Sequence, residues 1–98
     1  MKVYDLKNEE GKTFAFEISN LFVGRQGVVR TVRKIPQATL HKLPKLFSGE
    51  DVFCEFEVDG CMFEVSEDWG DSSRYWIGPK DRKWHPEIQI VREAFLQK

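Results

Sequence analysis

Alternation of apolar and polar residues is clearest between Val52 and Glu67. Two alternating runs, 52–58 and 61–67, are joined by Asp59-Gly60, the dipeptide most typical of a two-residue hairpin turn. This turn sets the register of the facing pairs, which are Val58–Cys61, Phe56–Phe63 and Cys54–Val65. The face that holds these pairs is expected to be core. The opposite face carries the remaining residues, namely Phe53, Glu55, Glu57, Met62, Glu64 and Ser66.

Four further segments have the composition of strands. A second hairpin is predicted from 3–6 and 13–18, since 13–18 alternates with its large apolar residues on one face. The polar segment 38–43 is predicted as a short edge strand. The aromatic segment 74–77 is predicted as a strand that ends at a Gly-Pro pair.

Apolar residues recur at helical spacing over 21–35, and Pro36 ends the element. Two glycines in its first half each disfavour a helix by about 1 kcal/mol relative to alanine. The helix therefore starts either near Ser19 or only near Arg25. Its valine content leaves a strand as the second-ranked interpretation.

A terminal helix is predicted over 86–98, because Pro86 suits a first helical turn and apolar residues follow at helical spacing. The elements together predict an α+β fold for a single domain, 1–98. It is an antiparallel sheet of about five to six strands in the order ββαβββα, with two helices in a single layer on one face.

Composition narrows the possible partners. The chain has 98 residues and a net charge of −1, from 15 basic and 16 acidic residues. This balance gives no general attraction to nucleic acid or to an anionic membrane. The N-terminal residues lack the apolar run of a signal peptide, and no segment approaches the ~18 apolar residues of a membrane-spanning helix. We expect a soluble, cytoplasmic protein with no membrane contact.

The cysteines and histidines suggest no catalytic chemistry. In the predicted register Cys54 and Cys61 lie roughly 13 Å apart along the strands, beyond the ~7 Å limit for a disulfide. Both are therefore expected to be reduced core thiols. Their spacing, with His41 and His85 on the flanks, matches no metal-ligand pattern. No catalytic residue, metal or cofactor is predicted, and an enzyme is the less favoured class.

The segment 68–86 is the chemically richest part of the chain, because it holds all three tryptophans. In one interpretation these rings fill the core, and charged residues tie the loop. In the other, the segment is a binding surface, since Trp, Tyr and Arg are the residues most enriched at interface hot spots. The candidate binding residues are Trp69, Asp71, Arg74, Tyr75, Trp76, Arg82 and Trp84.

Three glutamates share the outer face of the central hairpin, with Glu55 directly opposite Glu64 and Glu57 beside them. Like charges in facing positions destabilise a sheet. Either basic residues of the same chain cover these carboxylates, Arg74 being the expected one, or a partner does. They are a second candidate binding set.

A third candidate site opens the first helix, where Gly24, Arg25 and Gly27 resemble an anion site. The alternative for Arg25 is an ion pair with a carboxylate in the stretch 68–71, and this pairing is favoured. The basic region 25–45, which contains no acidic residue, could contact nucleic-acid phosphate. A solvated helix face, balanced by acidic residues elsewhere, or a contact with a protein partner is the favoured interpretation of this region.

The run Trp-Gly-Asp-Ser-Ser-Arg-Tyr-Trp-Ile-Gly-Pro at 69–79 resembles a pattern in small uncharacterised bacterial proteins, to which no activity is attached. So does the run at 24–36. The first functional hypothesis is a non-enzymatic protein-binding module of accessory, immunity or inhibitor type. The alternatives are a nucleic-acid-associated protein, and a small anion-binding protein or enzyme near Arg25, Asp71 and Arg74.

Overall fold

The computed structural model describes residues 1–19, 23–44, 51–67 and 73–97. They form an α+β fold, as predicted. Its elements, in chain order, are β1 (Val3–Lys7), β2 (Thr13–Ser19), α1 (Gly24–Arg33), β3 (Ala38–Lys42), β4 (Val52–Val58), β5 (Cys61–Glu67), β6 (Arg74–Pro79) and α2 (Ile88–Leu96).

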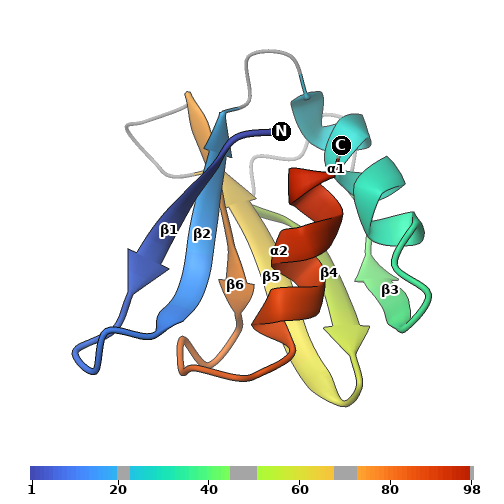
Figure 1. Ribbon diagram of the computed structural model, residues 1–98. Helices are drawn as coiled ribbons and strands as arrows, with labels where there is room; N and C mark the ends of the chain where they lie inside the picture. The colour runs from blue at the N-terminus through green and yellow to red at the C-terminus, as the bar shows by residue number, and fades with distance from the viewer. Residues whose placement is uncertain (20–22, 45–50, 68–72, 98) are drawn as a thin grey trace.

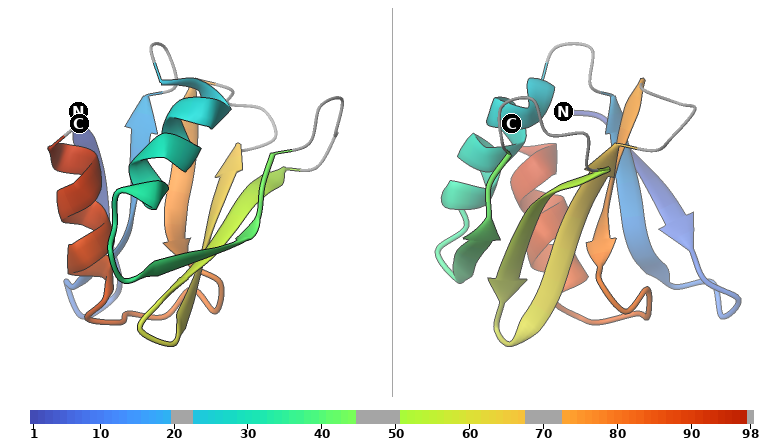
Figure 2. Two further views of the ribbon diagram at one scale, coloured as in Figure 1. Left: turned by 90° about the vertical axis from the view of Figure 1, so that its right-hand side faces the viewer. Right: turned by 180° about the vertical axis from the view of Figure 1, so that it is seen from behind.

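The six strands make one antiparallel sheet in the order β1-β2-β6-β5-β4-β3. Both helices lie on the same face of this sheet, which leaves the other face without a helical cover (Figures 1 and 2). We call the helix-covered side the inner face and the opposite side the outer face. The single helical layer of the prediction is confirmed.

The β4–β5 hairpin has the predicted register, with Val58 opposite Cys61 and Phe56 opposite Phe63. Asp59 and Gly60 both have positive φ, at 49° and 84°, as a two-residue turn of this type requires. Phe53 is where the prediction was wrong, because it was expected on the outer face. A register irregularity between Val52 and Cys54 lets Phe53 pack in the core, where it is 2% exposed.

Residues 24–33 form a helix, so the strand interpretation was wrong. The helix starts at Gly24, whose φ is +67°, close to the later of the two predicted starts. The earlier start near Ser19 involves residues 20–22, which lie outside the described residues. In the terminal helix, 86–87 form a turn and the regular helix begins at Ile88.

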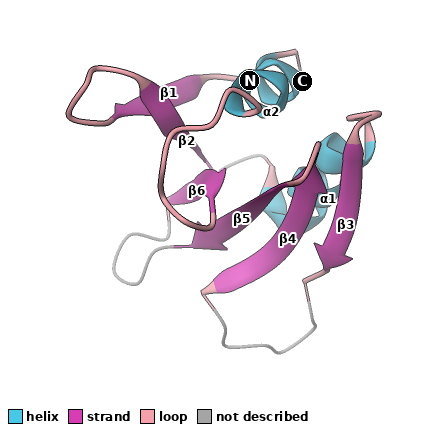
Figure 3. Cartoon of the chain, turned by 90° about the horizontal axis from the view of Figure 1, so that it is seen from below, coloured by secondary structure: helices cyan, strands magenta, loops and turns pink. Residues whose placement is uncertain are grey.

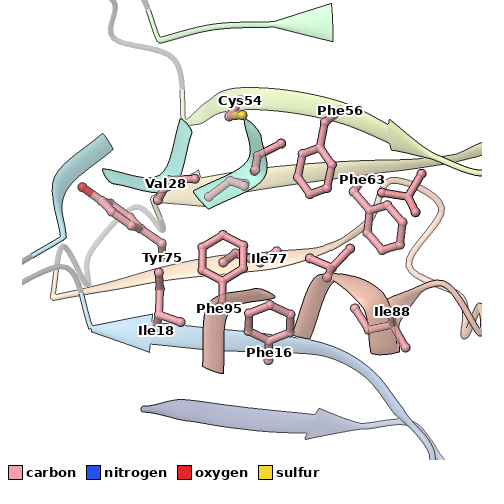
Figure 4. Packing of buried hydrophobic residues seen from close by; sticks show 14 of the residues in the cluster. Phe16, Ile18, Val28, Cys54, Phe56, Phe63, Tyr75, Ile77, Ile88 and Phe95 are labelled. Atoms are coloured by element: carbon pink, nitrogen blue, oxygen red, sulfur yellow. The ribbon is translucent and has the colours of Figure 1, made fainter. Parts of the chain in front are cut away.

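The core lies between the two helices and the inner face of the sheet, and aromatic rings dominate it (Figure 4). Phe95 of α2 meets Phe16 of β2 edge to face at 5.7 Å between ring centroids. Phe56 and Phe63 stack across the central hairpin at 5.5 Å. In the part of the chain that the structure describes, no helix is long and apolar enough to cross a membrane.

Candidate functional site

The outer face carries side chains from alternate positions of the central strands. Trp76 of β6 lies between Glu17 of β2 and Ser66 of β5 in the strand register. In the next row, Gly78 pairs with Glu64, which in turn pairs with Glu55 of β4. This face therefore brings an aromatic ring beside carboxylates, and so joins two candidate sets that the sequence analysis treated separately.

Trp76 is nevertheless buried, with only 6% of its surface exposed. Its indole lies across Gly78, since a Cβ atom added at Gly78 would come within 2.7 Å of the ring and of the Ala15 Cβ. The guanidinium of Arg82 lies 4.5 Å from the ring centroid on this exposed side of the sheet. The Trp76 ring thus covers Gly78 on the outer face, and Arg82 in turn covers the ring.

Tyr75 is buried too, at 4% exposed. It points to the inner face, where its ring meets Phe53 edge to face at 5.0 Å. Tyr75 therefore belongs to the core between the sheet and the helices, whereas Trp76 is buried on the outer face, outside that core. Trp69 and Asp71, the other candidates of the segment, lie outside the described residues.

Two of the three glutamates of the outer face, Glu55 and Glu57, have a side-chain partner in the same chain. Lys80 Nζ lies 3.3 Å from Glu55 Oε1, and His41 Nε2 lies 3.2 Å from Glu57 Oε1. Burial raises the pKa of Glu64, while the nearby Arg82 and Lys80 lower it and Glu55 raises it again. The facing carboxylates were therefore predicted correctly, and their cover is intramolecular.

Arg74 was expected to provide that cover and does not. Its Nη1 lies 3.3 Å from Glu17 Oε1, and its guanidinium carbon lies 3.8 Å from the ring centroid of Tyr4. Strand order explains the error, because β6 has β2 as its second neighbour and the Arg74 end of β6 pairs with Ser19 and Ile18. The sequence did not indicate that β2 and β6 are adjacent.

Trp84 differs from Trp76 in its exposure, which is 39%. The ammonium group of Lys12 lies 4.4 Å from its ring centroid, within the range of a cation–π interaction. The ring lines an open hollow of about 440 Å³ formed by the β1–β2 turn and the segment after β6, with lining residues Asn8, Glu9, Glu10, Lys12, Arg82, Lys83 and Trp84. Both segments lie at the lower end of the molecule in Figure 1.

Side-chain hydrogen bonds order both rims of this hollow. Asn8 Oδ1 accepts hydrogen bonds from the backbone N–H groups of Glu10 and Lys12, at 3.0 and 2.9 Å. On the opposite rim, Asp81 Oδ1 accepts from the backbone N–H of Lys83 at 2.9 Å. These side-chain hydrogen bonds to the backbone fix the conformation of both loops that line the hollow. The sequence marks residues 8–11 as a turn, but nothing in it indicated that this turn lines a hollow with Trp84.

Arg25 is paired, as the favoured alternative predicted. Its Nη2 lies 2.8 Å from Glu67 Oε1 and its guanidinium lies 4.7 Å from the Phe53 ring centroid. The partner found among the described residues is Glu67, and the stretch 68–71 named in the prediction lies outside them. Gly27 serves packing, because an added Cβ would lie 2.9 Å from Val23 Cγ1.

Both cysteines are free, as predicted. Burial, together with the nearby Glu55, raises the pKa of Cys54 to about 12. Burial, together with the nearby Glu87 and Asp81, raises the pKa of Cys61 to about 11. Neither thiol is ionised near neutral pH by its protein surroundings, so neither has the character of a catalytic nucleophile.

Comparison with known proteins found no family model, no curated protein and no solved structure that matches this chain.

Proposed function

We propose that this protein is a non-enzymatic protein-binding module, of accessory, immunity or inhibitor type, and that its contact surface centres on the hollow beside Trp84. The observation that carries the proposal is an exposed tryptophan next to ordered loop backbone. Tryptophan is the residue type most enriched among interface hot spots, whereas Trp76 and Tyr75 have structural places in the sheet.

Charge around the ring suggests the chemistry of the partner. Three cations, Lys12, Arg82 and Lys83, line the hollow with Trp84, against two carboxylates, Glu9 and Glu10. None of the three cations forms a salt bridge with any residue that the structure describes. A partner segment with carboxylates and one apolar side chain would complement the cations and cover the indole. The glutamates of the outer face take no part in the proposal, because Glu55 and Glu57 already have Lys80 and His41 of this chain as partners.

A matched pair of substitutions tests the proposal. Leu43 and Trp84 are the large hydrophobic side chains with the greatest exposure among the described residues, at 45% and 39%. The wild-type protein and the variants Leu43→Ala and Trp84→Ala serve as baits in a pull-down. A partner that the wild type captures is then purified, and its affinity for each of the three proteins is measured by titration. We expect Trp84→Ala to weaken binding about 30-fold or more, as for a hot spot of at least ~2 kcal/mol. Equal affinities for Trp84→Ala and wild type would overturn the proposal.

One observation favours nucleic acid as a second candidate partner. Arg30, Arg33 and Lys34 of the α1 region are exposed, and within the described ranges none of them forms a salt bridge. If these cations bind phosphate, retention on duplex DNA or on RNA should fall steeply as the salt concentration rises. On B-DNA the logarithm of the binding constant should fall with the logarithm of the salt concentration, with a slope near −0.9 per phosphate neutralised. Absent or salt-independent retention removes this candidate.

The third hypothesis, a ligand site between Arg25 and Arg74, has little geometric support. Arg25 lies on α1 and pairs with Glu67, whereas Arg74 pairs with Glu17 and stacks on Tyr4. The two guanidinium groups belong to opposite faces of the sheet and have different partners.

A further inference from the structure

Three side chains of the metal-ligating type meet at the lower end of the molecule. The Sγ of Cys61, a ring nitrogen of His85 and a carboxylate oxygen of Glu87 all lie within 4.8 Å of one another, and each residue is half-buried. Cys61 begins β5, whereas His85 and Glu87 come from the segment between β6 and α2, which Figure 3 shows crossing this end of the sheet. The fold thus joins two separate stretches of sequence at this cluster.

Turns and a backbone hydrogen bond hold the chain in place around the three side chains. Cys61 follows the tight Asp59-Gly60 turn. The carbonyl of His85 accepts a hydrogen bond from the backbone N–H of Ile88 at 3.1 Å, and Glu87 occupies the N-cap position of α2 without a side-chain capping hydrogen bond. The Glu87 carboxylate is thus not used to cap its own helix.

Asp81 lies within hydrogen-bond distance of one ring nitrogen of His85. The Nε2 atom of His85 lies 2.8 Å from Asp81 Oδ2 and 3.1 Å from Oδ1. A neutral imidazole that donates its Nε2–H to this carboxylate has its lone pair on Nδ1. A carboxylate that holds one ring nitrogen while the other binds metal is the usual arrangement around zinc-bound histidines.

We propose that Cys61, His85 and Glu87 bind a Zn²⁺ ion through Sγ, Nδ1 and one carboxylate oxygen. A thiolate, an imidazole and a carboxylate are the three ligand types of zinc, and three protein ligands leave the fourth tetrahedral position to water. Ligand atoms in such a site lie roughly 3.5 Å apart, so modest side-chain rotations close the observed cluster around the ion. Binding releases the thiol proton of Cys61 to solvent.

The charge of the site suits a cation. With the thiolate formed, Cys61, Glu87 and Asp81 contribute three negative charges, against which the neutral imidazole of His85 adds none. The sulfur and nitrogen ligands favour Zn²⁺ over Mg²⁺ and Ca²⁺, which require oxygen ligands. The ion would connect the start of β5 to the segment that carries Trp84, next to His85 in the chain.

The test is a titration of the purified, reduced protein with Zn²⁺ and, separately, with Co²⁺. We expect one equivalent to bind, and Co²⁺ to give the thiolate charge-transfer and tetrahedral d–d absorption bands of a site with a sulfur ligand. Cys61→Ser should abolish the charge-transfer band and lower the Zn²⁺ affinity by more than 100-fold. Asp81→Asn should lower that affinity by about 10–100-fold while retaining the band.

Cys54→Ser is the matched control, because Cys54 is the other free thiol and lies in the core away from His85. Its Zn²⁺ affinity should equal that of wild type, and thermal unfolding without metal checks that all variants are folded. Equal Zn²⁺ affinity in Cys61→Ser and wild type overturns the proposal, as does a charge-transfer band that disappears with Cys54. The measurement needs no partner, so its outcome is independent of the proposed function.

Discussion

Trp76 and Trp84 belong to one short segment, and a cation stacks on each ring, yet their surroundings are opposite. Trp76 is 6% exposed and lies flat across Gly78 and Ala15 under Arg82. Trp84 is 39% exposed, with Lys12 on its ring. The difference comes from the backbone, because Trp76 lies in a central strand with neighbours on both sides, whereas Trp84 follows the last strand. Aromatic density alone therefore does not locate a binding surface.

Trp76→Ala gives the largest effect that this comparison predicts. Removing the ring uncovers Ala15 and leaves a hollow on the outer face, so we expect a loss of about 3–5 kcal/mol in the free energy of unfolding. Chemical denaturation measures this loss. A loss below ~1 kcal/mol would show that Trp76 is surface-like and remove the contrast with Trp84.

Gly78→Ala probes the same packing from beneath. The new methyl group would lie 2.7 Å from both the Ala15 Cβ and the Trp76 ring, so the ring must move outward. We expect a loss of about 1–3 kcal/mol, typical of overpacking, and a change in the near-ultraviolet circular dichroism of the tryptophans. Gly60→Ala is unsuitable as a control, because the φ of Gly60 is positive. Ala94→Gly, at a half-buried site on α2, gives a reference for backbone effects of about 1 kcal/mol.

Glu64→Gln tests whether the negative charge of the carboxylates beside Trp76 lowers the stability of the folded protein. Burial and Glu55 raise the pKa of Glu64, so the folded state binds its proton more tightly than the unfolded state. Ionisation at neutral pH therefore costs stability, which returns as the pH falls through the raised pKa. We expect the variant to be more stable than wild type by about 0.2–1 kcal/mol at pH 7, with the difference vanishing near pH 4. Equal stabilities at pH 7 would contradict this.

Trp84→Ala should have the smallest effect on stability. It removes a partly exposed ring and one cation–π contact, so we expect a loss of about 0.5 kcal/mol. The comparison is sharpened if this variant unfolds at nearly the same denaturant concentration as wild type while losing the partner. A loss as large as that of Trp76→Ala would make both rings structural.

Local patterns in the sequence predicted the fold well. The Asp59-Gly60 turn and the alternation on both sides of it determine the β4–β5 register from the turn as far as the pair Cys54–Val65. The side of the sheet on which Phe53 lies was predicted wrongly, because the irregularity between Val52 and Cys54 has no sequence signature. An extra residue in one strand changes the face to which the side chains beside it point. The helices were identified by their period, but not their exact ends.

The candidate site was less predictable, because it depends on contacts between distant residues. Lys80, rather than Arg74, covers Glu55 because of where β6 ends in the sheet. Lys12 joins Trp84 only because β2 and β6 are neighbours. The cluster of Cys61, His85 and Glu87 likewise has no fixed spacing that a motif search would find.

The position of β6 between β2 and β5 also has a consequence for how the chain folds. The β1–β2 and β4–β5 hairpins join strands that are close in sequence and can form within microseconds. The two hairpins are not adjacent in the sheet, because β6 lies between them. Residues 74–79 join them, through the pairing of Ile77 with Phe16 on one side and Val65 on the other. During synthesis the two hairpins therefore cannot be joined into one sheet until β6 has emerged from the ribosome. We expect the pairing of β6 with β2, which closes the longest loop in the sheet, to limit the folding rate.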